Sequence, residues 1–159
     1  MNHINSLSSA KHIVQKIPVT KTNRSAFTHL ALCWHQCADL KFRQTLDNSE
    51  RQQFWSSRHI TRLIARSLRS RSHKKRFSSM YVTFDPNTKT IHAIALTKQH
   101  TLKTTVGDTL GKYLQIGLIA TNPINIRALC NLKESNRIKG AASSLIRNLH
   151  GSCSSMKYD

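Results

Sequence analysis

The stretch that decides the fold is residues 80–98, MYVTFDPNTKTIHAIALTK. Two runs rich in β-branched and aromatic residues flank the turn DPNT at 85–88, where proline sets φ at the second turn position and asparagine suits a tight bend. The pattern therefore predicts a β-hairpin. Its second run is apolar at nearly every position from 91 to 96, so we expect this strand to be central in a sheet that is covered on both faces.

The chain before this hairpin predicts a strand and two helices. Residues 12–20 are apolar enough for a strand, and Pro18 favours an edge position. Apolar residues at spacings of three and four predict a helix from an N-cap at Ser25 to about Leu46. The motif DNSE at 47–50 has the form of a capping box and opens a second helix.

The chain after the hairpin predicts one more strand and one more helix. Residues 113–120 are apolar on both faces, as in a covered strand. Residues 141–149 have helical spacing, and Gly151 follows as a C′ residue. We expect a flexible segment at 1–10 and a single domain of the α/β (α+β) class at 11–159.

The composition points to polyanionic partners. The 159 residues include 25 Lys and Arg against 7 Asp and Glu, a formal net charge of +18, which predicts attraction to nucleic acid, anionic lipid or a phosphorylated cofactor. No apolar run approaches the roughly 18 residues that cross a bilayer. The four cysteines lack paired spacing, so we expect a cytoplasmic protein without disulfides. The alternative is an organelle protein, because the segment before Asp39 is basic and rich in serine.

A stretch near the C-terminus, NRIKGAASSLIRNL at 136–149, has the features of a phosphate-binding loop. Small residues let a ligand approach the backbone, and successive amides at a helix N-terminus present partial positive charge to a pyrophosphate. The residues that we expect to bind this group are Arg137, Ile138, Lys139, Gly140, Ala141, Ala142 and Ser143.

The motif at 137–142, RIKGAA, and the expected order of elements resemble the GCN5-related N-acetyltransferase family, whose loop reads Gln/Arg-x-x-Gly-x-Gly/Ala. The resemblance implies a mixed, mostly antiparallel sheet flanked by helices and acetyl-CoA as the cofactor. It also implies transfer of the acetyl group to an amine, whose identity stays open. The strand before the loop would offer backbone groups to the pantetheine arm at Ile119, Ala120 and Thr121.

Two features depart from the family. Residues 124–135 make a long connection between Pro123 and the loop. The chain stops at Asp159, so we expect it to lack the C-terminal strand and helix that complete the family's acceptor cleft. A second copy in a homodimer would complete the sheet, or the chain is a shortened, inactive relative.

The catalytic residues cannot be assigned from the sequence. A general base for an amine acceptor would be an acidic residue in the second half of the chain. The acidic residues there that precede the loop are Asp85, Asp108 and Glu134. None lies in the strand at 113–120, and Asp85 is explained as a turn residue.

A basic stripe supports an alternative function, a nucleic-acid-binding module or a surface for an acidic partner. Its residues are Arg58, Arg62, Arg66 and Arg69 on one helix face, followed by Lys74, Lys75 and Arg76. No aromatic residue is interleaved with the stripe in this interpretation, so base stacking is not predicted and a solvated face is the simpler explanation.

One helix also carries His29, Cys33 and Cys37 at spacings of four, a residue set that zinc can use. Because no fourth ligand is evident, we expect no metal site there and interpret both cysteines as small, partly buried residues.

Overall fold

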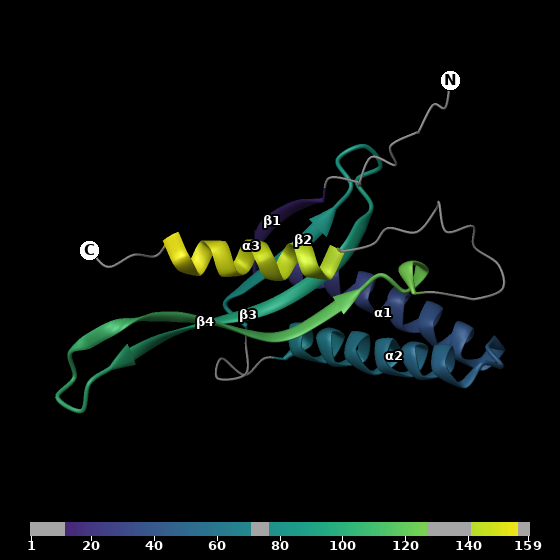
Figure 1. Ribbon diagram of the computed structural model, residues 1–159, viewed down its shortest axis with the longest axis horizontal. Helices are drawn as coiled ribbons and strands as arrows, with labels where there is room; N and C mark the ends of the chain where they lie inside the picture. The colour runs from purple at the N-terminus through teal and green to yellow at the C-terminus, as the bar shows by residue number, and fades with distance from the viewer. Residues whose placement is uncertain (1–11, 71–76, 127–140, 156–159) are drawn as a thin grey trace, which may run out of the picture.

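The computed structural model describes residues 12–70, 77–126 and 141–155, which form a four-stranded antiparallel sheet flanked by helices (Figure 1). The strands, in the order β1-β2-β3-β4, are β1 Ile13–Pro18, β2 Ser79–Phe84, β3 Ile91–Lys103 and β4 Thr109–Thr121. The helices are α1 Lys21–Gln44, α2 Asn48–Arg69, the short 3-10 helix η2 Pro123–Asn125 and α3 Ala141–Ser155. The predicted α+β class, with its mostly antiparallel sheet, is confirmed.

The hairpin predicted from residues 80–98 is present as β2 and β3. Asp85 closes the turn, because its Oδ1 accepts from the Asn87 amide at 2.8 Å and its carbonyl accepts from the Lys89 amide at 2.7 Å. Lys89 has a φ of 55°, the left-handed conformation that such a turn needs. The prediction of a central second strand is also confirmed, since β3 pairs with both β2 and β4.

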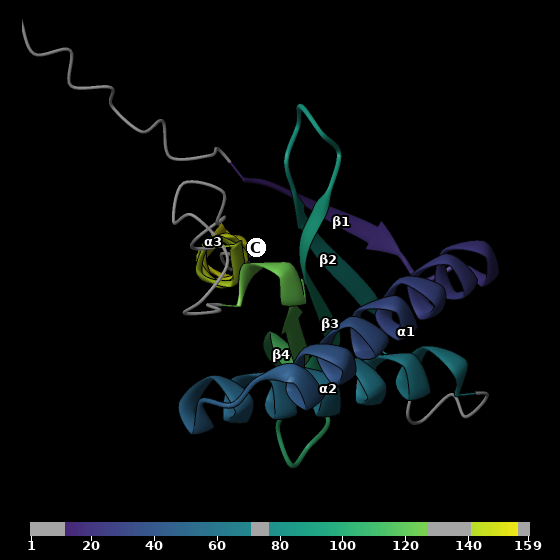
Figure 2. The same ribbon diagram turned by 90° about the vertical axis from the view of Figure 1, so that its right-hand side faces the viewer.

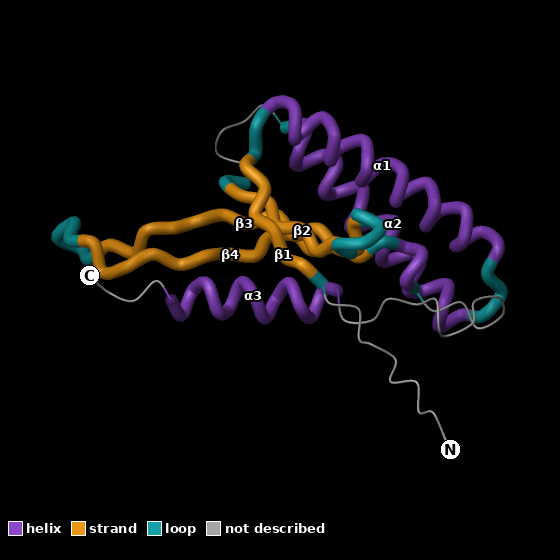
Figure 3. The backbone as a smooth tube through the Cα atoms, turned by 90° about the horizontal axis from the view of Figure 1, so that it is seen from above, coloured by secondary structure: helices purple, strands orange, loops and turns teal. Residues whose placement is uncertain are grey.

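The helices divide between the two faces of the sheet, with α1 and α2 on one and α3 on the other (Figures 2 and 3). Alternation along β3 explains this division. Ile94 and Leu96 are fully buried in the cluster that includes residues of α1 and α2. Ala93 and Ala95 point the other way, and their small side chains let Leu145 and the following turn of α3 pack closely on the sheet.

The start of α1 differs from the prediction. Ser25 was expected at the N-cap, but the helix begins at Lys21, and Thr20 is the cap, its hydroxyl accepting from the Asn23 amide at 3.2 Å. Residues 21–24 show no apolar periodicity, so the sequence pattern does not predict a helix there. At α2 the predicted capping residue is confirmed, because the Asp47 carboxylate accepts from the Glu50 amide at 2.9 Å.

A contact joins the first turn of α1 to the end of α2. Arg24 Nε donates to the Leu68 carbonyl at 2.8 Å, and its Nη2 donates to the Ser70 carbonyl at 3.0 Å. These carbonyls belong to the last turn of α2 and its C-cap, where carbonyl groups lack helical partners. Arg24 therefore satisfies the end of one helix from the beginning of the other.

Two further expectations are corrected. The prediction of a two-sided buried strand at 113–120 is wrong, because β4 is an edge strand on which Tyr113 and Ile116 are 50% and 38% exposed. The prediction of Gly151 as a C′ residue is also wrong, since α3 continues through it to Ser155.

The strands β3 and β4 are longer than predicted. Their distal halves form a two-stranded arm that extends beyond the helices (Figure 1). This arm, residues 98–112, is mostly polar and largely exposed, so it has none of the apolar pattern by which the sequence analysis recognised strands.

Candidate functional site

A pocket of about 380 Å³ lies between α2 and the carboxyl end of β4. The strand contributes Ile119, Ala120 and Thr121, the residues predicted to contact a pantetheine arm. The helix contributes mostly polar residues from its segment 52–60, and the chain after η2 contributes Ile126. The α2 residues that line it are Gln52, Gln53, Ser56, Ser57 and Ile60.

The pocket combines apolar walls with a small number of polar groups. Ile60, Ile119 and Ile126 make it partly hydrophobic, while Gln and Ser side chains of α2 offer donors and acceptors. The Ser57 hydroxyl is buried and has no hydrogen-bond partner in the part of the chain that the structure describes. Because this oxygen is shielded from solvent, the polar groups that a ligand can reach are the exposed side chains of Gln52, Gln53 and Ser56.

The carboxyl end of β4 is held in place by Asn122, a residue that the sequence analysis missed. Its Nδ2 donates to the Ile91 carbonyl at 3.2 Å, and its Oδ1 accepts from the Ile124 amide at 3.2 Å. Its backbone amide donates to the His92 carbonyl at 2.8 Å. The Asn-Pro step at 122–123 was the available signal, since it favours the start of a turn.

His92 is buried beside this end of β4, at 2% exposure. The register of β2 and β3 passes from Ala93 to Ile91, which leaves His92 as the extra residue of a β-bulge. The side-chain amide nitrogen of Asn125 lies 3.2 Å from His92 Nδ1. The His12 ring packs edge-on against the His92 ring, with the two ring centroids 6.1 Å apart. Burial, and then the nearby His12, lowers the pKa of His92, so the imidazole is neutral near pH 7.

The predicted phosphate-binding residues fall partly within the described residues. Ala141, Ala142 and Ser143 are the first residues of α3. The part of the motif at 137–140, with Arg137, Ile138, Lys139 and Gly140, lies outside the described residues. The structure therefore brings residues 119–121 to a pocket and leaves the loop itself undescribed.

Two of the candidate general bases, Asp85 and Asp108, do not line this pocket. Asp85 belongs to the β2–β3 turn, and Asp108 lies in the turn at the tip of the β3–β4 arm. Glu134 lies outside the described residues. Neither a carboxylate nor a histidine is among the described residues that line the pocket, so it contributes binding groups but no base.

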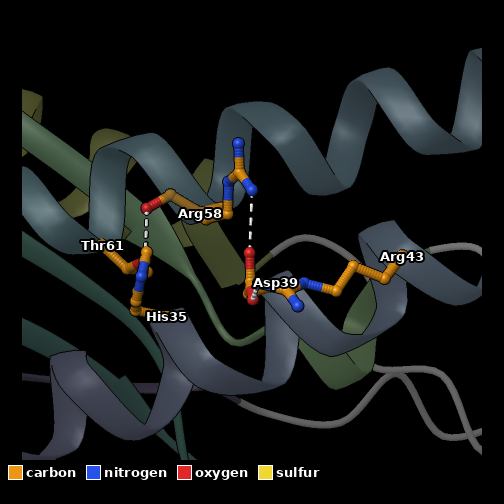
Figure 4. Close-up of polar contacts among 5 residues, drawn as sticks. All are labelled: His35, Asp39, Arg43, Arg58 and Thr61. Atoms are coloured by element: carbon orange, nitrogen blue, oxygen red, sulfur yellow. Dashed lines mark hydrogen bonds and ion pairs between the residues drawn. The ribbon is translucent and has the colours of Figure 1, made fainter.

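A second polar site lies where α1 and α2 pack together (Figure 4). Arg58 Nη1 contacts Asp39 Oδ1 at 2.8 Å, and Arg43 Nη2 contacts Asp39 Oδ2 at 3.1 Å. His35 Nδ1 lies 2.9 Å from the Arg58 carbonyl, to which an imidazole N–H donates. The hydrogen bond from Arg58, with the charges of both arginines, holds the pKa of Asp39 below its usual value.

The basic stripe predicted on α2 is present, but its residues differ in solvent exposure and in whether they pair with a carboxylate. Arg58 is partly buried by its pair with Asp39 and by the Phe42 ring, 4.6 Å from its guanidinium carbon. Arg62, Arg66 and Arg69 are exposed, and the described residues supply no carboxylate partner for them. The predicted continuation at Lys74, Lys75 and Arg76 lies outside the described residues.

The expectation of a stripe without aromatic residues is wrong. Trp55 is 44% exposed, and its indole stacks on the His59 ring with centroids 5.7 Å apart and planes 2° apart. Both lie with Arg58 and Arg62 around a pocket of about 310 Å³. The signal was available in the sequence, because positions 55, 59, 62 and 66 recur at helical spacings of three and four.

On α1, Cys33 Sγ lies 3.7 Å from His29 Nε2. Cys33 is exposed and Cys37 is partly buried. In the described ranges, no three His, Cys, Asp or Glu side chains are grouped so that they could hold a metal ion.

A scan against protein-family models, a search of curated proteins and a search of solved structures each found no match to this chain. Among the described helices, none is both long and apolar enough to cross a bilayer.

Proposed function

We propose that this chain binds acetyl-CoA and transfers the acetyl group to an amine, as the resemblance of its loop motif to the GCN5-related N-acetyltransferases implies. The observation that carries the proposal is the pocket at the carboxyl end of β4. It is lined by Ile119, Ala120 and Thr121, the residues expected from the resemblance to contact the cofactor. The order β1-α1-α2-β2-β3-β4-α3 supports the same assignment.

The chemistry of this region fits an acyl-pantetheine arm. The edge of β4 away from β3 pairs with no other strand in the described part of the chain, so its backbone groups are available to an extended ligand. The three isoleucines of the pocket suit methylene groups, and the Ser56 hydroxyl and the two glutamines suit amides. When bound, acetyl-CoA supplies the thioester carbonyl that an amine attacks.

The chain's own contribution at this pocket is binding and orientation. Backbone amides of β4 and the first residues of α3, Ala141 to Ser143, would hold the cofactor, with the residues at 137–140 completing the loop. No carboxylate or histidine is among the described residues that line the pocket, so we assign no catalytic residue.

Calorimetric titration with acetyl-CoA tests this proposal. Ser56 is an exposed residue of α2 at the pocket, so Ser56→Trp should fill the pocket while leaving the core unchanged. We expect the wild type to bind and Ser56→Trp to bind at least about 10-fold more weakly. The matched control is Ser25→Trp, an exposed α1 position that is not among the residues lining this pocket, which should bind like the wild type.

Two results would overturn the proposal: no acetyl-CoA binding by the wild type, or equal binding by the wild type and Ser56→Trp. Turnover is tested separately by following free CoA thiol in the presence of small primary amines. Binding without thiol release would assign the chain as a cofactor-binding relative without activity.

A further inference from the structure

We propose that the α2 surface around Trp55 binds single-stranded nucleic acid, with a base stacked on the indole and phosphates paired with the neighbouring arginines. We call this surface the Trp55 face and define it by Trp55, His59, Arg62 and Arg66 of α2 and Arg43 of α1. It is separate from the pocket at β4, because the two pockets share no lining residue.

Charge favours a polyanion at the Trp55 face. Its pocket is lined by three arginines, Arg43, Arg58 and Arg62, against one carboxylate, Asp39. Asp39 is already in contact with Arg43 and Arg58, so Arg62 and, one turn along α2, Arg66 remain without a carboxylate in the described residues. Such exposed guanidinium groups pair readily with phosphates.

The aromatic pair distinguishes nucleic acid from other polyanions. Trp55 is exposed, and its ring is held parallel to that of His59, which restricts the orientation of the indole. An aromatic ring flanked by cations is the arrangement that binds unpaired bases, since every base has a face that can stack. A base within a duplex is already stacked on its neighbours, so the Trp55 face favours a single strand.

The ion pair beneath the surface makes this geometry rigid. Arg58 of α2 pairs with Asp39 of α1, with 2.8 Å between Nη1 and Oδ1. His35 Nδ1 of α1 lies 2.9 Å from the Arg58 carbonyl oxygen. Both helices that carry the Trp55 face are therefore fixed relative to each other before any ligand binds, which reduces the entropy cost of binding.

Fluorescence anisotropy with a labelled oligothymidylate of about 12 nucleotides tests the inference, with a duplex of equal length as competitor. We expect Trp55→Ala to weaken binding about 10-fold or more without changing the salt dependence, and Trp55→Phe to retain most of the affinity. Arg62→Ala should lower the slope of log K against log[salt] by about 0.7, one phosphate contact. Lys112→Ala, an exposed cation of the β3–β4 arm, is the matched control and should have little effect.

Three results would overturn the inference. The first is unchanged affinity in Trp55→Ala, which would leave only an attraction to the net positive charge. The second is an equal loss in Lys112→Ala and Arg62→Ala, which would remove the preference for this surface. The third is tighter binding of the duplex than of the single strand. Ser56→Trp should bind the oligonucleotide normally, so failure of this inference and failure of the acetyl-CoA proposal are distinguishable.

Discussion

At the residue scale, single polar side chains link the two long helices. Asp39 is the clearest case, because it accepts from Arg58 on α2 and from Arg43 on its own helix. Apolar packing of α1 on α2 already favours particular registers, and the oriented carboxylate–guanidinium contact at 2.8 Å between Asp39 and Arg58 adds a polar constraint. Asp39 therefore connects the packing of α1 on α2 to the surface that carries Trp55.

The lowered pKa of Asp39 predicts a pH-dependent contribution to stability. Its folded-state pKa lies below the unfolded value of about 3.9, so its contribution is present above that pH and is lost as the pH falls through the folded-state pKa. We expect Asp39→Asn to be less stable than the wild type at pH 7. The difference should shrink as the pH falls below about 3.9. Urea unfolding of both proteins across this range measures it.

Asp108 supplies the control for this experiment, since its carboxylate makes no ion pair within the described residues. Asp108→Asn should leave the free energy of unfolding close to that of the wild type at pH 7. A constant difference between wild type and Asp39→Asn at every pH would contradict the assigned role of the ion pair.

Arg24 gives a second prediction at this scale. Arg24→Ala should lower the free energy of unfolding by about 1–3 kcal/mol, because two charged hydrogen bonds to the C-terminal carbonyls of α2 are lost. Urea denaturation measures the change, with Lys21→Ala, an exposed cation of the same turn, as the matched control. Equal stability of the two variants would show that the hydrogen bonds from Arg24 do not contribute to the free energy of unfolding.

At the scale of elements, β4 is shaped by a bulge. The register of β3 and β4 passes from Leu118 to Ile116, so Gly117 is the extra residue. A Cβ added at Gly117 would overlap the Phe77 ring, which packs against this point of the strand. A glycine in a strand often marks such a close approach, and here it leaves room for Phe77 over the edge strand.

This packing predicts that Gly117→Ala costs about 1–3 kcal/mol of unfolding free energy, because the Phe77 ring must move out of its position against the core. The same substitution should cost clearly less in a Phe77→Ala background, where the obstacle is gone. A double-mutant cycle by urea denaturation measures the coupling. Full additivity of the two substitutions would contradict the contact between position 117 and Phe77. Gly107 is not a suitable comparison, because its φ of 96° strains any other residue.

At the scale of the whole molecule, the dominant property is the net charge of +18 on 159 residues. Within the described residues, the ion pairs of Arg43 and Arg58 share one carboxylate, that of Asp39. Most cations therefore repel one another across the surface, which opposes the compact state and attracts polyanions.

This excess of charge predicts that salt stabilises the fold. Raising NaCl from about 0.05 M to about 0.5 M should increase the free energy of unfolding, because the Debye length falls and the repulsion between exposed cations is screened. Urea unfolding at each concentration measures the change. Chloride is preferred to sulfate, which stabilises by exclusion from the surface. Lower stability at high salt would mean that attractive pairs outweigh the repulsion.

The sequence by itself determined the features that depend on neighbours in the chain. The turn at 85–88 and the cap at Asp47 form through hydrogen bonds that span only a few residues, and both are visible as short motifs. The apolar run at 91–96 likewise identified the central strand, because burial on both faces leaves no position for solvent-exposed polar groups.

Only the tertiary structure decided the features that join distant residues. Arg24 joins the first turn of α1 to Leu68 of α2, and Gly117 makes room for Phe77. Residues 119–121 form a pocket only because α2 lies beside them, and Arg43 joins the Trp55 face only because α1 packs on α2. These contacts cross tens of residues of chain, so they depend on how the helices pack on the sheet, which no local pattern of residues encodes.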